Sequence, residues 1–515
     1  MDAQNPKKRI RWAVAALAVA TCAALPATAA ADTARNQVIV QLEAGHATAA
    51  AKAIVREDGG RVTGDLPIIN GFGAKVSADA AKALAATDGV KAVTPDGAVE
   101  PQEVKASDLV TAYPFSTTAT QSWNASLPAT GKGVGVAVID TGIAGDLRDF
   151  RVSQSDSRSR VIATAQVNPG STKAGDQYGH GTHVAGIIAG NSFNRSSQDL
   201  SRGMYAGIAP DANLIDVKVS DDDGDATILD VLYGIQFAVD FKDQLGIRVI
   251  NLSLESTVPQ SYKVDPLDAA VEAAWFKGLV VVAAAGNRGV VSDAVSYAPG
   301  NDPYVISVGG TDDNGSRNLS DDTLAPWSAR GVTQDGVAKP EINAPGARIV
   351  SNLAPGSQFA SMCPTCVLTG GMIRAGGTSM AAPMVAGAAA LLLERYPNLT
   401  PNQVKGILVD SARSLPGGLP GLDTYGALKR VESGNVPVAN QGLTPNPLVS
   451  AATGEIDYSR SSWSRSSWSN STGSQSADWS RSSWSRSSWS SYDSSGVQTS
   501  RSSWSRSSWS TSWTK

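Results

Sequence analysis

Histidine, cysteine and charge are all scarce in this chain of 515 residues. It has three histidines and three cysteines, and charged residues make up 17% of it. The net charge of −4 argues against a nucleic-acid partner, because proteins that bind nucleic acids present basic surfaces. A hydrophobic fraction of 42% is typical of a globular protein, and the length leaves room for two or three domains.

The N-terminus has the pattern of a secretion signal. Basic residues at positions 7, 8, 9 and 11 precede the apolar run from Trp12 to Leu25, and Ala29-Ala30-Ala31 follows as a cleavage zone. A membrane anchor is disfavoured, because the apolar run is shorter than the ~20 residues that a span needs. Cys22 suggests a lipoprotein site, but Thr21 fits poorly before such a cysteine. We predict a signal peptide over residues 1–31 and a secreted, extracellular protein.

Removal of this segment leaves two cysteines, Cys363 and Cys366, in the order Cys-Pro-Thr-Cys. In an oxidising compartment this pair predicts a disulfide. A redox dithiol is the alternative, but the pair lacks a strand-to-helix context, and zinc is disfavoured because no second Cys/His pair lies nearby. Because the loop is short, we expect the disulfide to pin the segment before Ser379 locally.

A small α+β arrangement is predicted for residues 36–100. Its order is βαββαβ, with a turn at Leu66-Pro67 between the middle strands, which is the ferredoxin-like arrangement. The expected strands include Val38–Leu42, Phe72–Val76 and Val90–Val93, and the expected helices are Ala47–Glu57 and a Ser77-capped helix to Thr87. An independent small binding domain is the alternative reading. Residues 101–122 have few periodic apolar positions and indicate an exposed junction.

Continuous apolar runs then alternate with helical patterns. Such runs are typical of strands buried on both faces of a parallel sheet, so we predict an α/β fold with a doubly wound parallel sheet and helices on both faces. The predicted strands are Gly133–Asp140, Leu214–Val219, Val249–Leu254, Leu279–Ala285 and Val305–Val308. The predicted helices include His183–Ala189, Thr227–Val239, Pro266–Lys277 and Pro401–Ser411. Active groups belong at the carboxyl ends of such strands.

The C-terminal part changes composition abruptly. Residues 434–458 are interpreted as a linker, and residues 459–515 hold six copies of Arg-Ser-Ser-Trp, which start at positions 460, 465, 481, 486, 501 and 506. A spacing of five keeps no face on a helix or a strand, so we predict a disordered tail. Its arginines and tryptophans suit contact with the cell wall or surface polymers, and a plain spacer is the alternative.

Three segments carry residues that together suit acyl transfer. Asp140 ends a predicted strand in VIDTG, His180 begins HGTHVAG, and Ser379 stands in GGTSMAAP before a helix that is apolar from residue 381 to 393. A serine nucleophile needs a neighbouring base and a carboxylate that fixes the tautomer of that base. Taken alone, each residue has a structural reading; for Ser379 it is a helix N-cap.

The same reaction needs donors for the developing oxyanion. Asn287, in AAAGN after a predicted strand, offers a side-chain amide, and the backbone N–H of Ser379 at a helix N-terminus offers a second donor.

These four motifs in this order resemble the subtilisin family of serine endopeptidases. The resemblance covers residues 112–433 and implies a sheet of about seven strands. It also implies Asp140, His180 and Ser379 as the triad and Asn287 as oxyanion donor. By the same resemblance residues 32–105 are a propeptide that assists folding, inhibits the enzyme and is removed by self-processing. A monomer acting on proteins or peptides, with no cofactor in the chemistry, is the expectation.

The resemblance also implies the substrate-binding residues. Ser253, Leu254 and Glu255 are expected to pair with substrate as a strand, and Ala284, Ala285 and Gly286 to bound an apolar primary pocket.

Two features depart from the family pattern. The family usually has Ser-Leu-Gly-Gly where this chain has Ser-Leu-Glu-Ser from residue 253, and the segment before Ser379 is longer than usual. Glu255 facing the cleft would favour cationic substrate side chains. The alternative is that Glu255 points to solvent or pairs with a neighbour such as Lys263 or Arg288, with little effect on specificity.

Two kinds of position in the sequence are candidates for metal binding. The family commonly binds structural calcium, and the runs Asp221–Asp225 and Asp312–Asn314 are candidates, although both also suit solvated loops. His180 and His183 are three residues apart rather than four, so His183 is interpreted as a core histidine. Two rival functions stay open at this point: a catalytically silent relative that only binds peptides, and an adhesion protein whose tail carries the function.

Overall fold

The computed structural model describes residues 35–101 except 44 and 47, residues 112–455 except 448, and the short segments 488–490 and 502–503. The predicted signal peptide, residues 102–111 of the predicted junction, and most of the tail lie outside the described residues. Among the residues that are described, no helix has both the length and the apolar character to cross a bilayer.

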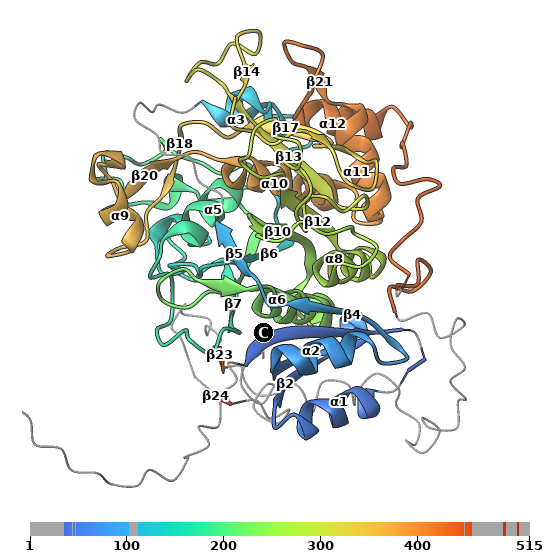
Figure 1. The fold of residues 1–515 in the computed structure, drawn as a ribbon. Coiled ribbons are helices and arrows are strands. Elements are labelled where there is room, and N and C mark those ends of the chain that lie inside the picture. Colours follow the sequence, from blue (N-terminus) through green and yellow to red (C-terminus); the bar gives the residue numbers. More distant parts are fainter. Residues whose placement is uncertain are drawn as a thin grey trace, which may run out of the picture. The chain divides into compact units, whose positions relative to one another are not determined.

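Seven parallel strands form the centre of the molecule, in the spatial order β17-β13-β12-β10-β6-β8-β7 (Figure 1). Their bounds are β6 (Gly135–Asp140), β7 (Val161–Gln166), β8 (Asn213–Lys218), β10 (Ile247–Leu252), β12 (Val280–Ala284), β13 (Ile306–Asp312) and β17 (Ile342–Pro345). The predicted α/β class with a doubly wound parallel sheet is thereby confirmed. Two strands were not predicted, because β7 and β17 include polar residues or proline and do not read as apolar runs.

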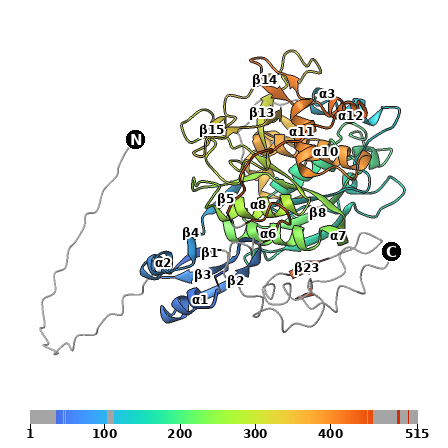
Figure 2. The same cartoon turned by 90° about the vertical axis from the view of Figure 1, so that its right-hand side faces the viewer.

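Helices cover both faces of this sheet (Figures 1 and 2). Helix α5 (His180–Ala189) packs against α10 (Thr378–Arg395), and α6 (Ile228–Asp240) packs against α8 (Pro266–Phe276). The other helices of this part are α3 (Tyr113–Ser116), α4 (Ala119–Trp123), α7 (Lys242–Leu245), α11 (Pro401–Asp410) and α12 (Thr424–Glu432), with the 3₁₀ turns η2 (Arg148–Phe150) and η3 (Ser192–Asn194). Capping boxes begin two of them, at Thr227 for α6 and Thr400 for α11.

Helix α10 is the central element. Every residue from Thr378 to Leu393 is buried, because this stretch has apolar or small side chains on all sides and the sheet and α5 surround it. Its N-cap is Gly377, so the alternative in which Ser379 caps the helix is wrong. Pro383 has no N–H for the carbonyl of Ser379, which lies one turn earlier, and Ser253 Oγ donates to that carbonyl instead (2.9 Å).

Residues 36–95 fold in the predicted βαββαβ order. The elements are β1 (Asn36–Leu42), α1 (Thr48–Glu57), β2 (Arg61–Leu66), η1 (Pro67–Ile69), β3 (Gly71–Val76), α2 (Ala78–Ala85) and β4 (Val90–Pro95), with sheet order β2-β3-β1-β4. Side chains alternate along β1: Val38 and Val40 join a small core under α1 and α2, whereas Ile39 belongs to the large core of the peptidase-like part.

The next strand, β5 (Ala98–Pro101), lies between two strands of the large part. It pairs antiparallel with β11 (Leu254–Ser256) on one side and with β9 (Ala226–Thr227) on the other. Both of its backbone edges are therefore engaged in this three-stranded sheet.

A second small sheet, β18-β20-β19, precedes α10. It consists of β18 (Ile349–Asn352), β19 (Val367–Leu368) and β20 (Met372–Ala375), with α9 (Gln358–Met362) and the 3₁₀ turn η4 (Pro364–Cys366) in the longer segment noted above. Cys363 and Cys366 are joined in this segment, with a Cα–Cα distance of 5.2 Å. The remaining short strands are β14 (Thr323–Leu324), β15 (Gly331–Val332), β16 (Ala338–Lys339), β21 (Arg413–Ser414) and β22 (Pro420–Gly421).

The described C-terminal residues contact helix α8 or the edge strand β7 of the parallel sheet. In the segment interpreted as a linker, Asn446 is fully buried and its N–H donates to Glu272 on α8 (2.6 Å). From the tail, β23 (Ser488–Ser490) pairs antiparallel with the sheet-edge strand β7, and β24 (Ser502–Ser503) pairs with β23. The backbone of these two short pieces is paired in strands, and the rest of the tail lies outside the described residues.

Candidate active site

The three motif residues lie at the carboxyl edge of the parallel sheet. Asp140 is the last residue of β6, His180 is the first residue of α5, and Ser379 is the second residue of α10. His180 Nδ1 lies 2.7 Å from Asp140 Oδ1, and both side chains are almost completely buried, with 0% and 3% exposed. A buried carboxylate at Nδ1 fixes the orientation of the imidazole ring, with Nε2 on the opposite side of the ring.

A further aspartate holds the loops around this pair. The buried side chain of Asp176 accepts hydrogen bonds from Thr141 Oγ1 (2.9 Å), from the N–H of Gly179 (2.7 Å), and from the N–H and Oγ1 of Thr182 (2.8 and 2.7 Å). Thr141 Oγ1 in turn accepts from the N–H of Gly181 (2.9 Å). Asp176 thereby ties the residue after Asp140 to the first turn of the helix that carries His180. Sequence analysis missed it, because a single aspartate in a loop has no distinguishing pattern.

Ser379 lies against the strand that is expected to receive substrate. Its Oγ donates to the backbone carbonyl of Ser253 (3.1 Å), and Asn251 Nδ2 donates to Ser253 Oγ (2.9 Å). Together with the bond from Ser253 Oγ to the carbonyl of Ser379, these contacts fix the entrance of α10 against the end of β10.

The amide of Asn287 has a defined orientation. Its Oδ1 accepts from the N–H of Thr378 (2.9 Å) and from Thr378 Oγ1 (3.2 Å), next to Ser379. Its Nδ2 is buried and has no hydrogen-bond partner among the described residues. A buried unpaired donor costs roughly 1–3 kcal/mol, so its presence beside Ser379 fits an acceptor that arrives with the substrate.

His183 is a structural histidine, in agreement with the sequence interpretation. It is fully buried, and its Nε2 lies 3.2 Å from the carbonyls of Ile349 and Ile373. Burial, and then the neighbouring His180, lower the pKa of His183 to about 3, so the ring stays neutral. Phe359 of α9 packs edge-on against both imidazole rings, with centroids 6.2 Å from His180 and 5.9 Å from His183. The long segment before Ser379 therefore contributes a ring to the site, which sequence analysis did not foresee.

Glu255 forms a salt bridge with Arg288, which is the alternative given above, and does not face the cleft as a free charge. Its side chain is 3% exposed, and its Oε1 accepts from Arg288 Nε (3.0 Å), whose guanidinium lies 4.0 Å above the ring of Tyr297. The same carboxylate lies against Gly286, where an added Cβ would approach Oε2 to 2.2 Å. The Glu255–Arg288 ion pair therefore lies beside residues 284–286. The sequence had predicted an apolar pocket at these residues.

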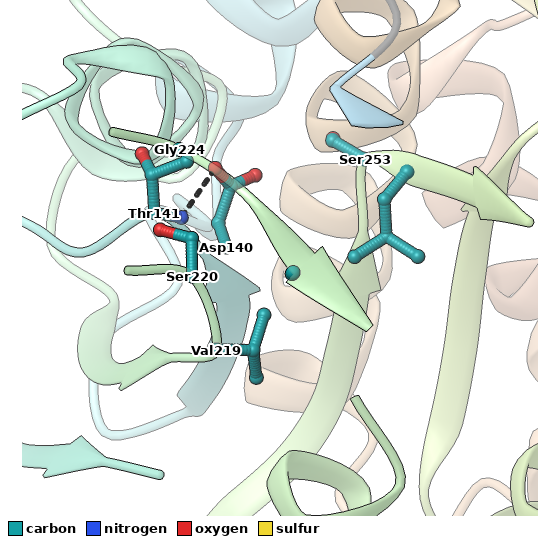
Figure 3. Close-up of a pocket in the computed structure, with 8 residues that line it drawn as sticks. Asp140, Thr141, Val219, Ser220, Gly224 and Ser253 are labelled. Carbon is teal, nitrogen blue, oxygen red and sulfur yellow. Dashed lines mark hydrogen bonds between the residues drawn. The ribbon is translucent and has the colours of Figure 1, made fainter. Parts of the chain in front are cut away.

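A pocket lies next to Asp140, at the carboxyl ends of the parallel strands (Figure 3). It is lined by Asp140, Thr141, Val219, Ser220, Gly224, Ala226, Ser253 and Leu254. Its walls thus include residues of β9 and β11, the two strands that flank β5.

The aspartates proposed for calcium already have partners within the chain. Asp221 Oδ1 accepts from the N–H groups of Asp223 and Asp225, and Asp222 pairs with Lys218 (3.1 Å). In the second run, Asp312 pairs with Arg348. Within the described parts of the chain, no group of three or more His, Cys, Asp or Glu side chains is arranged to hold a metal ion.

Comparison with known proteins identifies the class. The model of the subtilase family matches residues 131–427, more than half of the chain. The chain therefore belongs to the subtilase family.

Several relatives are proteases. Serine protease AprX of Bacillus subtilis (strain 168) is 39% identical over 284 residues, which cover 54% of this chain and 61% of AprX. Subtilisin BL of Lederbergia lenta is 37% identical over 286 residues, covering 56% of this chain and 86% of that protein. The crystal structure of fervidolysin from Fervidobacterium pennivorans, described as a keratinolytic enzyme related to subtilisin, matches with a TM-score of 0.59 and 25% identity, over 80% of this chain and 63% of fervidolysin. The chain thus spans less than two thirds of AprX and of fervidolysin.

Proposed function

We propose that this protein is a serine endopeptidase that hydrolyses peptide bonds through an acyl-enzyme on Ser379. The single observation that carries the proposal is the buried 2.7 Å contact between His180 and Asp140 at the sheet edge where Ser379 and Asn287 also lie. Family membership supports the reaction class.

Each residue has one role in this reaction. The hydroxyl of Ser379 turns from the carbonyl of Ser253 toward His180 Nε2, which takes its proton as Oγ attacks the substrate carbonyl. Asp140 holds the imidazole and stabilises the imidazolium that forms. The protonated His180 then gives its proton to the leaving amine, and water attacks the acyl-enzyme with His180 again as base.

The oxyanion of the tetrahedral intermediate is bound by Asn287 Nδ2 and by the N–H of Ser379. The unpartnered, buried Nδ2 supports this role, because a donor fixed in advance needs no rearrangement when the charge develops. Substrate lies as a strand along Ser253, Leu254 and Glu255.

We further propose that the protein is secreted, that residues 32–105 are a propeptide, and that the protein's own activity removes them. Placement of Ile39 in the large core and of β5 between β9 and β11 supports docking of this segment on the peptidase domain. In the oxidising exterior, Cys363 and Cys366 are a disulfide.

The test is Ser379→Ala in the full-length chain. We expect intact precursor and a loss of activity on the order of 10⁶ in kcat, the scale for removal of a triad serine. A fluorophosphonate should label the wild type and not the variant, with unchanged circular dichroism as evidence of folding. Self-maturation of the variant would refute the assignment of the nucleophile, and a wild type that neither hydrolyses peptides nor reacts would indicate a silent relative.

A further inference from the structure

We propose that Phe359 is a positioning residue for the base of the reaction, because its ring holds the imidazole of His180 in place. This inference rests on the proposed function, since it takes His180 as the base. It gives a role to the long segment before Ser379, to which the proposed reaction assigns none.

The ring of Phe359 lies among the aromatic side chains of the loop and helix that carry His180. Its centroid is 6.2 Å from that of His180 and 5.9 Å from that of His183, with interplanar angles of 76° and 79°. The ring of Tyr178 is a third neighbour, with its centroid 6.2 Å away. Edge-to-face rings at such distances attract each other. Phe359 is 4% exposed, so these contacts lie inside the protein.

The backbone of α9 is fixed to the loop that precedes His180. The N–H groups of Gln358 and Phe359 donate to the carbonyls of residues 177–178 (2.9 and 2.8 Å). Gly179 comes next in the loop, with a φ of 110°, and an added Cβ there would approach Phe359 Cβ to 2.7 Å. The segment therefore lies directly against the residue before His180, at a position where glycine leaves room for it.

Two further contacts keep α9 in this place. The side-chain amide of Gln358 donates to Asp223 Oδ1 (2.7 Å), in the loop after β8. Just past the end of α9, Cys363 is joined to Cys366, which is buried in the large core. Because the helix is held at both of its ends, the ring of Phe359 has little freedom to move away from the imidazoles.

The hydrogen bond to Asp140 does not by itself fix the imidazole of His180. It holds Nδ1 (2.7 Å), and the ring can still tilt about this contact. The neighbouring ring of Phe359 restricts that tilt and so keeps Nε2 in the orientation that the two proton transfers need. Because a displacement of about 1 Å can lower a rate ~100-fold, this restraint acts on kcat more than on substrate binding.

The experiment compares Phe359→Ala with Phe237→Ala in the full-length chain. Phe237 is the matched control, because it is fully buried and stacks on Phe241 near the end of α6. We expect Phe359→Ala to lower kcat about 10- to 50-fold on a soluble peptide, with KM within about twofold. Phe237→Ala should lower Tm and leave kcat within about twofold of the wild type. A wild-type kcat for Phe359→Ala would overturn the proposal.

A second measurement separates positioning from general stability. The far-downfield proton NMR signal of the His180–Asp140 hydrogen bond should shift or broaden in Phe359→Ala and stay unchanged in Phe237→Ala. Phe359→Leu keeps a buried apolar side chain without a ring, so it should retain the wild-type Tm and still lose kcat. An unchanged NMR signal, a wild-type kcat for Phe359→Leu, or failure of both variants at Phe359 to fold would show that the ring only supports the fold.

The result is distinguishable from a failure of the proposed function. If Ser379→Ala is inactive and Phe359→Ala is fully active, the proposed function stands and the positioning role is wrong. If the Ser379→Ala chain still matures by itself, the proposed function is wrong, and the assignment of His180 as base is lost with it.

Discussion

Asn287 is the side chain proposed to bind the charge that develops during the reaction. Thr378 holds Oδ1 of the amide, and Nδ2 is left buried without a partner among the described residues. The amide is therefore oriented before substrate arrives, and under the proposed function we expect it to stabilise the transition state more than it strengthens substrate binding.

We expect Asn287→Ala to lower kcat by about 10²–10³ with little change in KM, the loss typical of removing one oxyanion donor. Steady-state kinetics on a soluble peptide measure both constants. Asn301→Ala, a change at a buried asparagine that donates to the carbonyl of Gln260, is the matched control for general destabilisation. A normal kcat for Asn287→Ala would exclude the role.

Asp176 positions the loop and the helix turn that carry His180. Its carboxylate accepts four hydrogen bonds, which lower its pKa. Burial is the larger effect, so the pKa of Asp176 is raised above its usual value. An amide in its place offers one oxygen instead of two, and its NH2 group faces the N–H of either Gly179 or Thr182, donor against donor.

We expect Asp176→Asn to reduce kcat about 10- to 100-fold, because small misplacement of His180 weakens proton transfer. The KM should stay within about twofold. The pH dependence of kcat should also change, which a merely structural defect would not produce. Asp243→Asn, at an exposed side chain, serves as control. An unchanged pH profile with a lowered Tm would mean that Asp176 only stabilises the fold.

At the scale of elements, the contact between the N-terminal segment and α6 brings two carboxylates together. Asp96 Oδ1 accepts from the N–H of Leu229 (3.0 Å), and burial raises the pKa of Asp96. Burial also raises the pKa of Asp230 to about 7, with further contributions from the charges of Asp96 and Asp221. The Thr227 bonds lower the pKa of Asp230 but do not compensate.

These shifts predict that docking weakens as pH rises. The docked state raises the pKa values, so it binds protons more tightly than the released state, and its stability is lost as pH increases through about 7. After cleavage, co-elution of the segment with the peptidase on gel filtration should be stronger at pH 6 than at pH 9. Asp96→Asn should flatten this dependence. Equal retention at both pH values in the wild type would contradict it.

The element patterns were largely readable from the sequence. Helix α10 is apolar from Ala381 to Leu393 and is buried on all sides, and Ser77 caps α2 through Ala80 as expected. Strands β7 and β17 escaped prediction because their residues, such as Gln166 and Asn343, are buried by neighbours that are distant in the chain.

At the scale of the whole molecule, we expect formation of the parallel sheet to limit the rate of folding. Its neighbouring strands are joined through helices and long connections, so nearly every strand contact is non-local and slow to form. The segment before the peptidase domain contacts α6 and the β9 and β11 strands, where it can hold them together as the sheet forms.

We expect expression without residues 32–105 to yield little active enzyme, even though the triad is complete. The measure is the yield of fluorophosphonate-reactive protein per amount of chain expressed. Addition of the segment in trans should restore that yield and then inhibit hydrolysis. Efficient folding of the bare domain would show that the sheet needs no assistance.

The sequence by itself determined which residues stand at the ends of which elements. Asp140, His180 and Ser379 were placed there by apolar periodicity and by family motifs, both of which are local patterns. Only the tertiary structure decided which side chains meet: Asp176 with the loops around His180, Phe359 with the two imidazoles, and Glu255 with Arg288 rather than with the open cleft. The reason is physical. Each of these contacts joins segments far apart in the chain, and a side chain's direction in a loop depends on neighbours that no local pattern contains.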